Sequence, residues 1–193
     1  MRYRVLLLAL SYALCGPVQS AAQDGPALKA PPPEASQFDF LVGEWTVDVT
    51  SKAPGTPPQY HGVWRAAKTL NGLGVVDEYG IVDDSNRVVY SGTTLRVFDT
   101  KAGKWTMRYV DQLGGRTGRW SELVGVKEGR EIHVEQRGQA LDGRTTILRI
   151  RYYNIQPHHF SWAADQSSDA GATWVRDYLR LEATRRSKTA PQP

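Results

Sequence analysis

The chain has 193 residues, a formal net charge of +4 at pH 7 and a single cysteine. A small net charge spread along the chain does not indicate nucleic-acid binding. If the single cysteine, Cys15, is removed with an N-terminal signal, the mature chain needs no oxidative folding, and structural thiolate sites and cysteine nucleophiles are excluded. The length accommodates one domain of about 150 residues that buries its own core, together with two short terminal segments. We therefore expect a single-domain protein without a nucleic-acid partner.

The N-terminus is typical of a secretory signal peptide. A short basic start precedes an apolar run over residues 5–14, and small residues follow at 20–22. The run of about ten residues is shorter than the roughly twenty that span a bilayer. We expect residues 1–22 to be removed, leaving a periplasmic or secreted protein with no stable membrane insertion. An uncleaved anchor and lipidation of Cys15 are the alternatives.

Two further segments flank the predicted domain. Residues 23–35 are rich in alanine and proline and predict an extended linker. Residues 184–193 are polar and predict a disordered tail, in which the basic cluster at 185–188 is expected to be solvated. The folded domain is therefore expected to span residues 36–183, beginning with a short helical turn around 36–41.

Between these ends the sequence predicts strands almost without interruption. Trp45, Val47 and Val49 alternate with polar residues, which is the period of a half-buried strand. Segments rich in Val, Ile, Thr, Tyr and Trp then recur between turn signals. The expected strands are 45–50, 60–70, 74–82, 88–99, 104–111, 117–126, 130–136, 145–154, 158–164 and 173–182.

The connections between these strands are short and rich in Gly, Asn and Asp, as at Asn71-Gly72 and Glu128-Gly129. They are too short for crossover helices, so neighbouring strands should pair as antiparallel hairpins. A long meander exposes two edges unless it closes. We therefore predict an all-β fold, a single antiparallel meander barrel of about ten strands. A two-sheet sandwich is the alternative.

The opening segment Phe38-Asp39-Phe40-Leu41-Val42-Gly43-Glu44-Trp45 resembles the Gly-x-Trp start of the calycin superfamily, which includes lipocalins and fatty-acid-binding proteins. With Phe98-Asp99 through Trp105, and with Asp169-Ala170-Gly171-Ala172-Thr173-Trp174, the chain resembles more closely a family of exported bacterial lipocalin-like proteins of unknown function. This resemblance covers residues 36–183. It implies a barrel and export, and no activity.

Nitrobindin-like haem barrels are a more distant resemblance. They open in a similar way but continue with glycines after the tryptophan, where this chain has Thr46-Val47-Asp48. We therefore expect no haem, and no other cofactor is predicted. In calycins an arginine of the last strand commonly packs over the opening tryptophan. The resemblance implies that Arg180 or Arg176 packs over Trp45 as a structural contact, after a turn at Gly43.

The segment Ser167-Ser168-Asp169-Ala170-Gly171-Ala172-Thr173-Trp174 also matches the Asp-box hairpin of sialidases. Asp169 can accept backbone N–H bonds, Gly171 permits a positive φ, and Trp174 can pack beneath the turn. Propellers carry such hairpins in repeated blades, and this chain has one copy. The motif therefore predicts a structural turn rather than a glycosidase.

Several predicted strands carry aromatic and charged residues on one face. A lumen lined in this way suits a ring or an apolar chain, and an arginine beside a tyrosine suits a carboxylate. The residues that share faces are Trp105, Met107, Tyr109 and Asp111; Trp120 and Glu122; Tyr90, Thr94, Arg96 and Phe98; and Trp174, Arg176, Tyr178 and Arg180. The residues expected to bind a ligand are Trp105, Tyr109, Trp120, Arg176 and Tyr178.

Three functions remain open from the sequence. The first is a non-enzymatic barrel that binds a small amphipathic or aromatic molecule, with an anionic group as one option. The second is a lyase or isomerase with Asp111 or Glu122 as acid or base in the lumen. The third is a structural or interaction module of the cell envelope. No metal site is predicted, because the adjacent His158 and His159 point to opposite faces of a strand.

Overall fold

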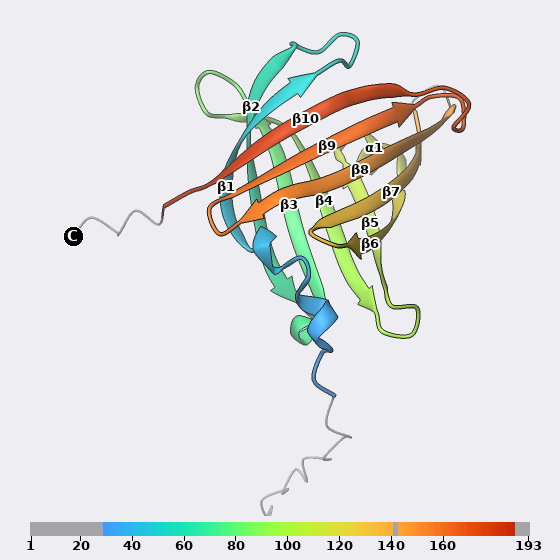
Figure 1. Ribbon diagram of the computed structural model, residues 1–193. Helices are drawn as coiled ribbons and strands as arrows, with labels where there is room; N and C mark the ends of the chain where they lie inside the picture. Colours follow the sequence, from blue (N-terminus) through green and yellow to red (C-terminus); the bar gives the residue numbers. More distant parts are fainter. Residues whose placement is uncertain (1–28, 141–142, 188–193) are drawn as a thin grey trace, which may run out of the picture. The chain divides into compact units, whose positions relative to one another are not determined.

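The computed structural model describes residues 29–140 and 143–187, so the predicted signal peptide lies outside the described residues. Ten antiparallel strands form a closed barrel in which every strand pairs with its chain neighbours and β1 pairs with β10 (Figure 1). The predicted meander barrel is confirmed. The strands are β1 (Gly43–Ser51), β2 (Gln59–Thr69), β3 (Gly74–Val82), β4 (Val88–Asp99), β5 (Lys104–Asp111), β6 (Ser121–Glu128), β7 (Glu131–Gln139), β8 (Thr145–Gln156), β9 (His159–Ser167) and β10 (Val175–Arg185).

The largest difference from the predicted strands precedes β6. The segment expected to be a turn followed by a strand forms a short helix, α1 (Gln112–Thr117). The Asp111 side chain caps this helix by accepting a hydrogen bond from the Gly114 N–H at 2.6 Å, and Gly118 ends it with a φ of 67°. Strand β6 therefore begins at Ser121, four residues later than the predicted start at Thr117.

Two 3₁₀ turns, η1 (Pro33–Ser36) and η2 (Asp39–Leu41), precede β1 at one end of the barrel, and α1 lies at the other end (Figure 1). Phe38 and Leu41 are fully buried. The end of the predicted linker also belongs to the fold, because η1 begins at Pro33 and Ala35 is buried. The Ser36 hydroxyl donates to the Pro33 carbonyl at 2.6 Å and closes η1.

The arginine over Trp45 is Arg185, not Arg180 or Arg176. Strand β10 continues past the predicted end at 182, and Arg185 lies opposite Trp45 in the register. Its guanidinium carbon is 4.1 Å from the centre of the indole. A Cβ added at Gly43, whose φ is 122°, would lie 2.5 Å from Arg185 Nη1, so this close approach requires glycine. Arg180 is exposed and lies opposite Thr50, on the outer face.

Aromatic side chains fill the lumen near η1 and η2. Trp105 is fully buried, with its ring centre 4.9 Å from Phe38 and 5.4 Å from Phe98, and its indole N–H donates to Gln37 Oε1 at 3.1 Å. Edge-to-face packing of this kind stabilises a core beyond the effect of burial alone. The other large aromatic residues of this core are Trp45, Trp64, Tyr152 and Phe160. This end of the barrel is a packed core.

A buried ion pair lies within the barrel. Arg96 and Asp77 are each almost fully buried, and the Arg96 guanidinium pairs with the Asp77 carboxylate. Asp77 also accepts the Trp64 indole N–H at 2.9 Å, and Arg96 donates to the Tyr152 hydroxyl at 3.2 Å. These neutral partners satisfy part of the hydrogen-bonding capacity that burial removes from water.

The β9–β10 connection forms the predicted Asp-box turn. Asp169 accepts hydrogen bonds from the Thr173 N–H at 2.9 Å and the Thr173 hydroxyl at 2.6 Å, which hold the pKa of this carboxyl down at about 2. Gly171 has a φ of 99°, and its carbonyl accepts the Trp174 indole N–H at 3.0 Å. Arg149 on β8 stacks on Trp174 with 3.9 Å between the guanidinium carbon and the ring centre. The motif serves as a turn that packs on the outer wall.

Candidate functional site

Tyrosines gather in the barrel beside the aromatic core, against which Tyr60, Tyr79 and Tyr109 pack. The Tyr79 ring centre is 5.8 Å from that of Trp64. The β4–β5 register places Phe98 and Trp105 at one end of this hairpin and Gly92 and Asp111 at the other. Tyr109 shares the inward face with Trp105, because side chains two residues apart point to the same side of a strand. We call the five tyrosines in this part of the barrel the tyrosine network; they are Tyr60, Tyr79, Tyr90, Tyr109 and Tyr178.

Hydrogen bonds connect this network to one carboxylate. The Tyr90 hydroxyl donates to Asp111 Oδ2 at 2.8 Å and lies 2.8 Å from the Tyr109 hydroxyl. Tyr60 and Tyr79 also share a hydrogen bond. Burial raises the pKa of all four phenols, to about 12 for Tyr109. The four hydroxyls are therefore neutral hydrogen-bonding groups near neutral pH, rather than tyrosinate nucleophiles.

A cavity of about 190 Å³, the mouth pocket, adjoins the network where β5 meets α1. Asp111 and Tyr109 contribute its acidic and phenolic groups, and Trp120 follows α1 with 58 % of its surface exposed. Arg119 donates to the Thr117 hydroxyl and the Ala140 carbonyl, both at 3.0 Å. The described residues that line the pocket are Tyr109, Val110, Asp111, Gly114, Arg119, Trp120, Ser121, Gln139 and Ala140.

One glycine makes room for the Tyr109 ring. Gly92 lies on β4 next to the Tyr109 side chain, and a Cβ built there would overlap both the hydroxyl and the ring. Gly92 is buried and pairs with Asp111 in the β4–β5 register. The sequence therefore provides the space in which Tyr109 can reach Tyr90.

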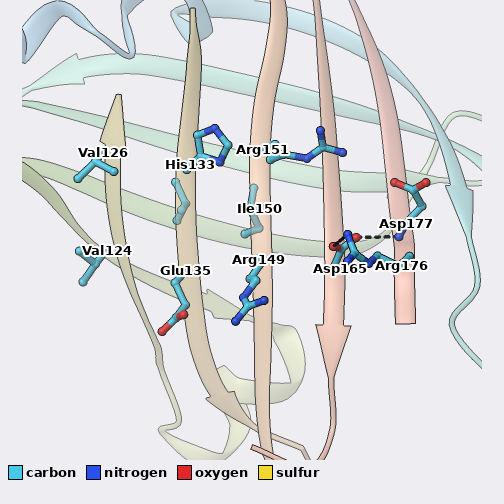
Figure 2. A pocket seen from close by; sticks show the side chains of 11 residues that line it. Val124, Val126, His133, Glu135, Arg149, Ile150, Arg151, Asp165, Arg176 and Asp177 are labelled. Atoms are coloured by element: carbon cyan, nitrogen blue, oxygen red, sulfur yellow. Dashed lines mark hydrogen bonds and ion pairs between the residues drawn. The ribbon is translucent and has the colours of Figure 1, made fainter. Parts of the chain in front are cut away.

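A second hollow, the outer groove, lies on the outer wall over β6 to β10 and has a volume of about 730 Å³ (Figure 2). Arg176 borders it with an exposed side chain, and its Nη1 is 3.7 Å from Asp165 Oδ2. Three arginines are matched by three acidic residues, as is ordinary on a solvated wall. The residues labelled in Figure 2 are Val124, Val126, His133, Glu135, Arg149, Ile150, Arg151, Asp165, Arg176 and Asp177.

The residues predicted to bind a ligand do not share one cavity. Tyr109 and Trp120 both line the mouth pocket. Tyr178 belongs to the tyrosine network and is hydrogen-bonded to Gln166. Trp105 lies in the aromatic core without exposed surface, and Arg176 lies in the outer groove.

The predicted face of the last strand is wrong, and a bulge explains it. The β9–β10 register shifts between Val175 and Leu179, and Asp177 within this segment has a φ of 47°. Arg176 consequently lines the outer groove, while Tyr178 faces Gln166. Alternation alone could not reveal this change of face.

The two carboxylates suggested for acid–base chemistry lie on different sides of the wall. Asp111 lines the mouth pocket, whereas Glu122 is exposed and 3.0 Å from Arg108 on the outer face. Among the residues with described positions, no group of three or more His, Cys, Asp or Glu side chains is placed to hold a metal ion. No helix in the described ranges is both long and apolar enough to cross a membrane.

Sequence reasoning missed Tyr60, Tyr79 and Arg119. Tyr79 lies opposite Trp64 across the β2–β3 hairpin, so the alternation in both strands and the register of the turn at Asn71 together carried a signal for it. Arg119 gave no such signal, because its position depends on α1.

A scan against protein-family models and a comparison with curated protein sequences give no match. Among solved structures, the chain is similar to the crystal structure of Rv2717c from M. tuberculosis, with a TM-score of 0.58 and 15 % sequence identity. The similarity covers 81 % of this chain and 99 % of that one. This similarity supports the barrel fold.

Proposed function

We propose that this protein is an exported β-barrel that binds a small amphipathic molecule in the mouth pocket. The apolar part of the ligand lies on Trp120, and its polar end reaches Tyr109 and Asp111. Export rests on the N-terminal sequence pattern, and N-terminal sequencing of the protein from its host tests it. A mature chain that begins near residue 23 is expected, whereas an intact Met1 would contradict removal of the signal.

The main observation behind the binding proposal is that the Trp120 side chain is exposed beside the polar groups of Asp111 and Tyr109. Large aromatic residues are usually buried, yet this side chain is 58 % exposed. It shares the mouth pocket with Asp111 and Tyr109, whose partner Tyr90 lies 2.8 Å from both. An apolar wall with a few convergent polar groups is the usual composition of a small-molecule site.

The size of the pocket restricts the ligand. Its volume of about 190 Å³ is below the roughly 300–1,000 Å³ of pockets that enclose a drug-sized molecule. We therefore expect a single-ring compound, or one end of a longer molecule that extends into solvent. At the opposite end of the barrel, near η1 and η2, side chains of the aromatic core fill the lumen.

The same geometry favours binding over acid–base catalysis. Both Asp111 oxygens already accept hydrogen bonds, from Gly114 and Tyr90. The neighbouring tyrosines are neutral, and Glu122 lies outside the barrel. Asp111 is the one carboxylate among the described lining residues, and no histidine joins it there, so these residues do not supply a second group to complete an acid–base pair.

Saturation-transfer NMR with benzamide as the probe tests this proposal. Benzamide provides a single ring and a neutral polar group. We expect saturation transfer with the wild-type protein, loss of the signal in Trp120→Ser, and an unchanged signal in Val126→Ser, which alters only the outer groove. Loss in Val126→Ser alone would place the ligand in the outer groove, and no signal from the wild-type protein would refute the proposed site.

A further inference from the structure

We infer that the mouth pocket selects a ligand whose aromatic ring carries a cationic hydrogen-bond donor, such as an amidinium or ammonium group, over one that carries a carboxylate. This inference rests on the proposed function and specifies its ligand class. The expected cationic ligand differs from the anionic ligand that the sequence left open. The evidence for the cationic preference is the direction of the hydrogen bonds among Asp111, Tyr90 and Tyr109.

The hydroxyl protons of Tyr90 and Tyr109 can be assigned from their hydrogen bonds. A carboxylate only accepts hydrogen bonds, so the 2.8 Å contact between Tyr90 and Asp111 uses the single Tyr90 proton. The 2.8 Å contact between Tyr90 and Tyr109 must then use the Tyr109 proton. The oxygen of Tyr109 consequently meets the mouth pocket as an acceptor with no proton left to donate. The raised pKa of both phenols agrees with this assignment, because both remain protonated.

Asp111 adds further acceptor capacity. Its Oδ1 accepts the Gly114 N–H at 2.6 Å, and its Oδ2 accepts the Tyr90 hydroxyl. Each carboxylate oxygen offers about two lone-pair positions, so each keeps one beyond these contacts with described residues. A ligand that donates hydrogen bonds therefore finds partners at this end of the pocket, and a ligand carboxylate would face another carboxylate.

Arg119 is the only arginine or lysine among the described lining residues, and the protein's own acceptors already hold it. Its Nε donates to Thr117 and its Nη1 to Ala140, each at 3.0 Å. A guanidinium binds a carboxylate most strongly through two adjacent N–H groups that have no other acceptor. Because Arg119 Nε already donates to Thr117, the pair of donors that includes Nε is no longer available to a ligand. The exposed Trp120 face adds a site that attracts cations and not anions.

Three probes of nearly equal shape test the inference by isothermal titration calorimetry on the full mature protein. They are benzamidine, which is cationic, benzamide, which is neutral, and benzoate, which is anionic. We expect benzamidine to bind at least about tenfold more tightly than benzamide, and benzoate to bind most weakly. In Asp111→Asn the preference for benzamidine over benzamide should disappear, and in Asp165→Asn, on the outer wall, it should remain.

The outcomes separate this inference from the proposed function. Equal affinity for the three probes would overturn the charge preference and leave a mouth-pocket ligand in place. Tightest binding of benzoate, lost in Arg119→Gln, would also overturn it and identify Arg119 as an anion clamp. If none of the probes binds, the proposed function fails with the inference. The ranking in the wild-type protein needs no variant, so a misfolded Asp111→Asn would not make the result ambiguous.

Discussion

The guanidinium of Arg185 lies 4.1 Å from the centre of the Trp45 ring and donates hydrogen bonds to three backbone carbonyls, those of Phe40, Val42 and Pro157. One side chain thus connects the last strand to the first strand, to η2 and the residue that follows it, and to the β8–β9 turn. The pairing of β1 with β10 closes the barrel, so that neither strand is an exposed edge. The contact between Arg185 and Trp45 stabilises this pairing.

We expect Arg185→Met to lower the free energy of unfolding by about 2–4 kcal/mol, since it removes the cation–π contact and leaves three carbonyls without their donor. Arg180→Met is the matched control and should change this free energy by less than about 0.5 kcal/mol, because Arg180 is exposed. Urea unfolding measures the free energy of unfolding of both variants, provided that its dependence on urea concentration has the same slope as in the wild-type protein. Equal effects of the two variants would contradict the structural role of Arg185.

The buried pair of Asp77 and Arg96 predicts non-additive behaviour. Arg96→Met leaves a buried carboxylate without its cation and should destabilise the protein by about 3–5 kcal/mol. The double variant Asp77→Asn/Arg96→Met removes the charge and keeps an acceptor for the Trp64 indole, so it should recover at least about 2 kcal/mol of that loss. A double-mutant cycle in urea measures the coupling. A strictly additive double variant would show that the two charges do not interact.

The tyrosine network predicts a loss of stability in alkali. The pKa of Tyr79, Tyr90 and Tyr109 is raised above the ordinary value of 10.0, so above pH 10 the folded state binds more protons than the unfolded chain. The free energy of unfolding should therefore fall as the pH rises above 10, by up to about 1.4 kcal/mol per pH unit for each such tyrosine. Tyr109→Phe should make this fall less steep.

Urea unfolding between about pH 8 and 11, with tyrosinate absorbance near 295 nm, measures that dependence. Below pH 10 these three tyrosines are expected to add no pH dependence to the free energy of unfolding, because they are protonated in both the folded and the unfolded state. Ionisation of all tyrosines near pH 10 in the folded protein, with no change of slope in Tyr109→Phe, would contradict the burial of the network.

Gly92→Ala tests the space that admits Tyr109. The added methyl group would overlap the Tyr109 ring, so this ring must move away from Tyr90. We expect benzamide affinity to fall at least about tenfold while the free energy of unfolding drops by about 1–3 kcal/mol. Gly115→Ala, on α1, is the control, because the nearest atom to its Cβ would be Val110 Cγ2 at 3.9 Å. Similar affinities in the two variants would argue against a role for the Tyr109 position.

The sheet could be predicted from sequence because period-two alternation and turn residues are local signals. Strands β3, β4 and β5 have the predicted bounds for this reason. The end of β10 could not be predicted in the same way. Its bulge between Val175 and Leu179 reverses the face, and Arg185, in a cluster that reads as a solvated tail, is instead packed on Trp45. Both features depend on pairing with distant strands.

Two residues of the candidate site were among those named from the sequence. Tyr109 and Trp120 were predicted to contact a ligand because of the residues with which they share a strand face, and both line the mouth pocket. Their connection through α1 was not foreseen, because Gly114-Gly115 has the composition of a turn and Asp111 shows its capping role only in three dimensions. Tyr60 and Tyr79 were missed because their contact follows only when the alternation of β2 and β3 is combined with the register set by the turn at Asn71.

The most direct test of a ligand site at the mouth pocket is the map of tryptophan indole N–H resonances during titration with benzamide. The chain has six tryptophans, and Trp120→Phe assigns the resonance of interest. We expect the Trp120 resonance to shift in a saturable way, while that of Trp105, fixed to Gln37 in the aromatic core, stays in place. A saturable shift of Trp105 with Trp120 unmoved, or no shift at either, would contradict binding at the mouth pocket.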